Sequence, residues 1–126
     1  MNRNYQLGLL CLTHLLIGAD GTIHNNEVDA LKIIKDNEKI SDTLFNEFEH
    51  LVSNKKEKEI FQSGIDLLSH CNNEEKLMVF AMLYKLSEVD GRVHVKEIRL
   101  LLYSIKVAGI EFDDVVNKAM ILPPLL

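Results

Sequence analysis

The sequence contains few residues that interrupt regular structure or cross-link the chain. Its 126 residues include two prolines, six glycines, two cysteines and no tryptophan. Because proline and glycine are the strongest breakers of helices and strands, their scarcity favours helices. Two cysteines are too few for a disulfide framework, and Cys11 and Cys71 each lie in an apolar run, which predicts buried free thiols.

Positive charge is also in short supply. There are 14 Lys and Arg residues against 19 Asp and Glu residues, a formal net charge of −5. This balance disfavours nucleic acid as a partner, because phosphate binding needs a cationic surface. It is compatible with a divalent cation or a basic protein partner. The 47% hydrophobic content excludes a disordered chain, and the length predicts a single domain over residues 1–126.

The short signatures of common enzyme classes are missing. The sequence has no Cys-x-x-Cys pair, no glycine-rich phosphate loop and no Gly-x-Ser-x-Gly elbow. His14, His50 and His70 have no partners at zinc-ligand spacing, and the mixed-sign run Lys55–Lys58 fits a solvated helix entry. We therefore expect a protein without enzymatic activity.

The longest apolar run is residues 7–19, LGLLCLTHLLIGA. It resembles the hydrophobic region of a signal peptide, but it is shorter than the roughly 20 apolar residues of a transmembrane helix. A similar apolar segment recurs near residue 80, where nothing can be cleaved from an N-terminus. We therefore expect residues 7–19 to belong to the fold, with no transmembrane segment, and the protein to be cytoplasmic.

The most specific feature is a duplicated motif. Residues 20–27 read DGTIHNNE, and residues 90–97, which lie 70 positions later, read DGRVHVKE. The shared pattern is Asp-Gly-x-(Ile/Val)-His-x-x-Glu, and similarity on both sides extends the repeat to about residues 7–52 and 77–122. Each copy predicts a helix, a tight turn at Asp-Gly and a second helix.

The helices before the turns, over residues 5–18 and 74–89, are apolar almost all round, so we expect them to pack against each other inside the core. The helices after the turns are predicted over residues 25–35 and 95–108, and Gly109 is a plausible C-cap. In the second of these helices, a buried stripe is predicted at Ile98, Leu101, Leu102 and Ile105.

Three other segments carry helical patterns: a helix opened by Ser41-Asp42, a stripe over residues 60–68 and a final amphipathic helix over residues 111–120. Asn72 or Asn73 is expected to cap the helix of the second copy. Since no alternating strand pattern appears, the predicted class is all-α, with about seven helices in two related helix-turn-helix halves.

The motif has a structural interpretation and a chemical one. In the structural interpretation, Asp-Gly makes the turn, and His24 with Glu27, like His94 with Glu97, has the spacing of a capping box. In the chemical interpretation, carboxylates of the two turns converge on a divalent metal ion of unknown identity. The candidate metal ligands are Asp20, Glu27, Asp90 and Glu97, with His24, His94 and Glu88 as weaker candidates. A calcium EF-hand does not fit, because its first ligand position falls on Leu16 and on Leu86.

At these residues the sequence resembles the TerB family, named for tellurite resistance. The resemblance rests on Ala19-Asp20-Gly21-Thr22-Ile23 through Glu27 and Val89-Asp90-Gly91-Arg92-Val93 through Glu97, and it covers roughly Leu7 to Met120. It implies a compact all-α bundle, a non-enzymatic role in tellurite or other chemical stress, and metal binding by the acidic positions, with Asp29 as a further neighbour. It also implies protein partners, including membrane-proximal complexes, and an alternative role as an interaction or co-chaperone-like module in which the turns are purely structural.

Overall fold

The computed structural model describes residues 3–17, 25–86 and 95–122, with side chains for residues 3–16, 31–86 and 99–122. Within these ranges the chain forms seven helices and no strand, which confirms the all-α class. The helices are α1 (Arg3–Ile17), α2 (Asn25–Asn37), α3 (Asp42–Ser53), α4 (Glu57–Ser69), α5 (Asn73–Leu86), α6 (Val95–Ala108) and α7 (Phe112–Ile121).

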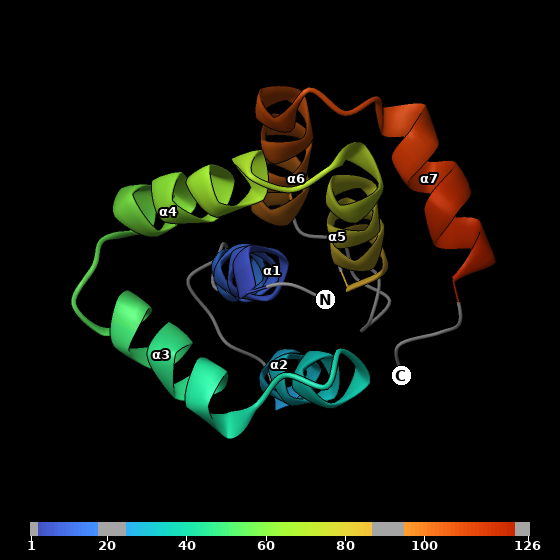
Figure 1. Cartoon of the computed structure of the whole chain (residues 1–126). Coiled ribbons are helices and arrows are strands. Elements are labelled where there is room, and N and C mark those ends of the chain that lie inside the picture. The colour runs from blue at the N-terminus through green and yellow to red at the C-terminus, as the bar shows by residue number, and fades with distance from the viewer. Residues whose placement is uncertain (1–2, 18–24, 87–94, 123–126) are drawn as a thin grey trace.

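Helix α1 is the centre of the bundle. It contacts α2, α3, α4, α5 and α6, and in Figure 1 it is seen end-on with the other helices arranged around it. Its buried side chains are Tyr5, Leu7, Leu9, Leu10, Cys11, Leu12, Thr13, Leu15 and Leu16. The predicted packing of the two helices that precede the motif copies is confirmed, because α1 contacts α5. In the described part of the chain, no helix has the length and hydropathy to cross a membrane.

The most extensive contact between helices in the described part of the chain joins α1 and α4, and two glycines allow their approach. A Cβ added at Gly8 would lie 2.9 Å from Leu68 Cδ2, and one added at Gly64 would lie 3.2 Å from Leu12 Cδ2. Both distances are shorter than ordinary van der Waals contact. The absence of side chains at Gly8 and Gly64 therefore sets the spacing between α1 and α4.

Helix α5 begins with a reciprocal capping box. The Glu75 backbone N–H donates to Asn72 Oδ1 at 2.8 Å, and the Asn72 backbone N–H donates to Glu75 Oε1 at 3.1 Å. Ser41 caps α3 by accepting the Leu44 backbone N–H at 3.1 Å. These bonds satisfy N–H groups that have no partner within the helix. The caps predicted at Asn72 and Ser41 are confirmed.

Helices α2 and α6 end in the same way. The Ile40 N–H donates to Lys35 O at 2.9 Å, and the Ile110 N–H donates to Ile105 O at 3.2 Å. The residue before each isoleucine has a left-handed backbone, with φ of 53° at Lys39 and 75° at Gly109. This is the Schellman motif, so the C-cap predicted at Gly109 is confirmed, and a non-glycine residue occupies the matching position at the end of α2.

The second set of helices begins at a constant distance from the first. Helices α1, α2 and α3 begin at residues 3, 25 and 42, and α5, α6 and α7 begin at residues 73, 95 and 112, which is 70 residues later in each case. The contacts correspond as well, since α1 packs against α2 and α3 while α5 packs against α6 and α7. Helix α4 connects the two sets and fills the space beside α1 (Figure 1).

The predicted core stripe of α6 is wrong at one position. Leu101 and Ile105 are buried, but Leu102 is 43% exposed, and the side chain of Ile98 lies outside the described ones. Successive residues are turned by about 100° around a helix, so Leu102 lies away from the direction in which Leu101 points. Ser104 takes part in the buried face instead, and its hydroxyl donates to Leu100 O at 2.7 Å.

Candidate functional site

The predicted metal ligands belong almost entirely to segments outside the described residues. Asp20, His24, Glu88, Asp90 and His94 all fall there. The backbones of Glu27 and Glu97 are described, and each is the third residue of its helix, α2 or α6, but their side chains are not. The convergence of the four carboxylates stays a prediction.

The part of the chain that the structure describes contains no other candidate for a metal site. No group of three or more His, Cys, Asp or Glu side chains there is placed to hold an ion. The metal hypothesis therefore depends on the two Asp-Gly turns alone.

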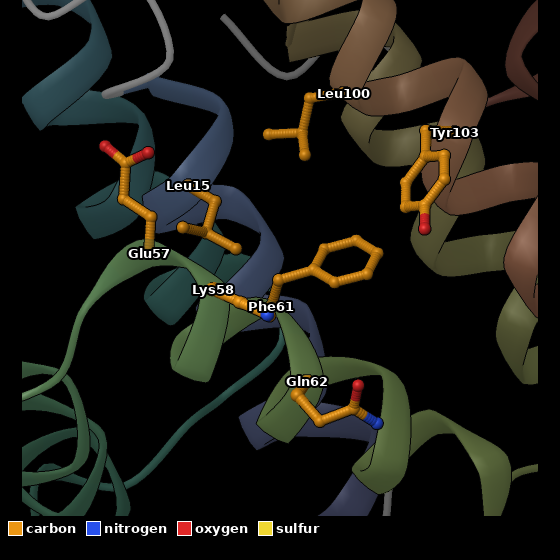
Figure 2. Close-up of a pocket in the computed structure, with 7 residues that line it drawn as sticks. All are labelled: Leu15, Glu57, Lys58, Phe61, Gln62, Leu100 and Tyr103. Atoms are coloured by element: carbon orange, nitrogen blue, oxygen red, sulfur yellow. The ribbon is translucent and has the colours of Figure 1, made fainter.

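The described residues do form an apolar groove. It has a volume of about 450 Å³ and lies between α1, α4 and α6 (Figure 2). Its lining consists of Leu15, Glu57, Lys58, Phe61, Gln62, Leu100 and Tyr103. Phe61 reaches from α4 into the space between Leu15 and Tyr103, and its ring lies 5.5 Å from the Tyr103 ring at an interplanar angle of 37°. The arrangement suits the binding of apolar side chains or rings.

Charged and polar groups surround this apolar lining. Glu57 and Lys58 are exposed at the start of α4, and the Gln62 amide donates to Asp66 Oδ1 at 2.9 Å. The side chain of Tyr103 is 58% exposed, so one wall of the groove is open to solvent. The groove therefore combines an apolar contact surface with solvent-exposed charges, at Glu57 and Lys58, that can form ion pairs with a ligand.

The groove is close in sequence to both Asp-Gly turns. Leu15 lies five residues before Asp20, and Leu100 lies three residues after Glu97. One wall thus belongs to the helix that precedes the first Asp-Gly motif in the sequence, and another belongs to the helix that contains the end of the second motif.

The described residues include two buried cysteines, Cys11 and Cys71. Burial raises the pKa of the Cys11 thiol to about 11, and it also raises the pKa of Cys71. Since the reactive form is the thiolate, neither cysteine is activated. Both are free and buried, which confirms the sequence prediction.

His14 and Tyr5 are also held by the packing. Burial lowers the pKa of His14 against a smaller opposing effect of Glu57, and its ring meets the Phe48 ring edge-on at 5.9 Å between centroids. Burial raises the pKa of Tyr5, whose hydroxyl donates to Glu38 Oε1 at 3.2 Å. These contacts join α1 to Phe48 of α3 and to Glu38, the residue after α2.

The groove was not predicted from the sequence. Phe61 belongs to a predicted apolar stripe and Lys58 to a predicted solvated helix entry, and both predictions fit the structure without indicating a shared site. One signal was available, namely Tyr103, an aromatic residue outside the predicted buried stripe of its helix. Together with Leu102 and Val107, which are also exposed, Tyr103 belongs to a group of neighbouring apolar residues that is typical of a contact surface.

The fold and its surface define a small helical module built around one central helix. A family model described as "Tellurite resistance protein TerB" matches residues 6–117. The chain therefore belongs to the TerB family, and the match covers the segment on which the resemblance was based. Neither the comparison with curated proteins nor the comparison with solved structures found a match.

Proposed function

We propose that this protein is a non-enzymatic TerB-like module that binds a divalent cation through its duplicated turns during the response to tellurite or a related chemical stress. The ligands in this proposal are Asp20, Glu27, Asp90 and Glu97. The observation that carries it is the retention of both acidic positions in the two copies of the motif.

The architecture around the turns supports a duplicated site. Helix starts recur after 70 residues, and α2 and α6 end in the same Schellman motif, with Lys39 and Gly109 in the matching positions. A duplicated helix pair presents equivalent positions twice, so each acidic turn has a counterpart. Clustered carboxylates repel one another, and a cation with oxygen ligands relieves that repulsion.

Thermal melts with and without Ca²⁺, Mg²⁺, Mn²⁺ or Zn²⁺ test the proposal. An ion that binds only the folded state adds about 2.7 kcal/mol to the free energy of unfolding at 100 times its Kd. We expect the shift to disappear in the double variant Asp20→Asn with Asp90→Asn, and on addition of EDTA. The matched control is Asp113→Asn with Asp114→Asn, because these two carboxylates are exposed in the first turn of α7 and belong to neither copy of the motif.

The metal proposal is wrong if millimolar concentrations of each ion leave the melting temperature unchanged. It is also wrong if the control variant loses the shift as completely as the Asp20 and Asp90 variant does.

The second candidate is a protein-interaction or co-chaperone-like module in which the acidic turns are structural. The groove lined by Phe61 and Tyr103 favours it, because an open apolar surface is typical of partner binding. The same melts separate the two candidates, since this one predicts no effect of metal. It also predicts that partner binding persists in EDTA.

A further inference from the structure

We propose that the groove and the adjoining outward face of α6 form one docking surface for an acidic amphipathic segment of a partner protein. The partner chemistry is a row of large apolar side chains flanked by carboxylates. The inference goes beyond cation binding at the turns and holds with or without it.

The outward face of α6 has an unusual composition. Among its described residues, 99–108, there are two cations, Arg99 and Lys106, and no acidic residue. Both cations are exposed, and no ion pair involves either of them in the described part of the chain. Leu102, Tyr103 and Val107 are exposed beside them, at 43%, 58% and 45%. On a protein with a net charge of −5, this face is locally cationic and apolar.

The face of α6 continues into the groove. Arg99 and Tyr103 are four residues apart and therefore lie on the same side of the helix. Tyr103 is also a wall of the groove, where its ring contacts Phe61 of α4. Lys58 adds a third exposed cation across the groove from α6, and Figure 2 shows it beside Phe61. Glu57 is the one carboxylate in the lining, so the three cations still outnumber it. The apolar residues thus form one surface with positive charge along it.

Charge complementarity selects an acidic partner. An amphipathic helix binds by placing its apolar face in such a groove, and carboxylates at its edges would pair with Arg99, Lys106 and Lys58. A second copy stacked α6 on α6 would bring like charges together, which is unfavourable. An anionic membrane is also a poorer fit, because lipid-binding clusters usually hold about four to eight cations and a flat bilayer does not fill a groove of about 450 Å³.

The test uses fluorescence anisotropy of a labelled short peptide of Leu and Glu arranged amphipathically, measured in EDTA. The comparison probe replaces each Glu with Lys. We expect the Glu peptide to bind and the Lys peptide to bind at least about tenfold more weakly. Tyr103→Ser should weaken binding about tenfold, because aromatic anchors dominate such interfaces. Arg99→Glu combined with Lys106→Glu should weaken it to a similar extent and reduce its salt dependence.

Lys32→Glu is the matched control, since Lys32 is exposed on α2, which Figure 1 places on the other side of α1 from α6. All these residues are exposed, and circular dichroism melts verify that each variant is folded. The proposal is overturned if the Glu peptide fails to bind, or if Lys32→Glu weakens binding as much as the α6 variants do. It is also overturned if Tyr103→Ser abolishes only self-association in analytical ultracentrifugation or only binding to phosphatidylserine vesicles, since the occupant would then be a second copy or a membrane.

Discussion

The matching ends of α2 and α6 allow the cost of a left-handed backbone conformation to be measured twice in one protein, once by introducing a glycine and once by removing one. Lys39 and Gly109 occupy the same position of the Schellman motif, with φ of 53° and 75°. The perturbation is an exchange: Lys39→Gly at one end and Gly109→Ala at the other. Lys39→Gly should stabilise the fold, and Gly109→Ala should destabilise it.

The magnitude follows from two opposing effects. A left-handed conformation costs a non-glycine residue roughly 1–2 kcal/mol. A glycine at the same position lowers the stability by about 0.4–1 kcal/mol, because it makes the unfolded chain more flexible. The net effect is therefore about 0.5–1 kcal/mol at each site, with opposite signs. No packing effect interferes at Gly109, because an added Cβ would meet nothing within 4 Å.

The assay is urea unfolding followed by circular dichroism, with thermal melts as a check. For a domain of this size, 1 kcal/mol corresponds to a shift in Tm of about 3–5 °C. Lys39→Ala is the control, because it removes the lysine ammonium from the helix C-terminus and keeps a Cβ. If Lys39→Gly is no more stable than Lys39→Ala, and Gly109→Ala unfolds like the parent protein, the reasoning from backbone strain is refuted.

Three further predictions concern packing, capping and pH. Gly8→Ala gains about 1 kcal/mol of helix propensity, but overpacking against Leu68 costs about 1–3 kcal/mol. Urea unfolding should therefore show a net loss of stability, which Leu68→Val should relieve in part. A stabilised Gly8→Ala variant would contradict the close approach of α1 and α4. Asn72→Ala should lower the unfolding free energy by about 1 kcal/mol by removing the cap of α5, and an unchanged urea midpoint would refute that role. Folding lowers the pKa of His14, so below about pH 6.5 the unfolded chain binds more protons than the folded chain, and stability falls as the pH falls. His14→Gln should flatten the dependence of Tm on pH in this range. An unchanged slope would assign the effect to another group.

Much of the fold could be predicted because its signals are local. The predicted helix over residues 95–108 has the bounds of α6, since the motif precedes it and Gly109 ends it. A core helix was predicted over residues 5–18, and α1 (Arg3–Ile17) is that helix. The error at Leu102 arose because periodicity cannot decide which edge of a wide apolar stripe remains exposed once neighbouring helices cover only part of it.

The groove could not be predicted in the same way. Leu15, Phe61 and Tyr103 are far apart in the sequence, and they meet only because α4 and α6 both pack against α1. Crossing angles and spacing between helices decide that meeting, and in this protein Gly8 and Gly64 set part of the spacing. The duplicated acidic motif differs from the groove, because its residues are neighbours in the sequence and the motif can be recognised from the sequence alone.

The central position of α1 has a consequence for how the chain is made. The most deeply buried helix is synthesised before all the helices that cover it, and its largest contact surface, on α4, follows about 40 residues later. During synthesis the apolar side chains of α1 therefore lack most of their final neighbours until α4, α5 and α6 have left the ribosome. The bundle closes late, and a nascent chain that stalls after α3 presents an uncovered apolar helix to chaperones.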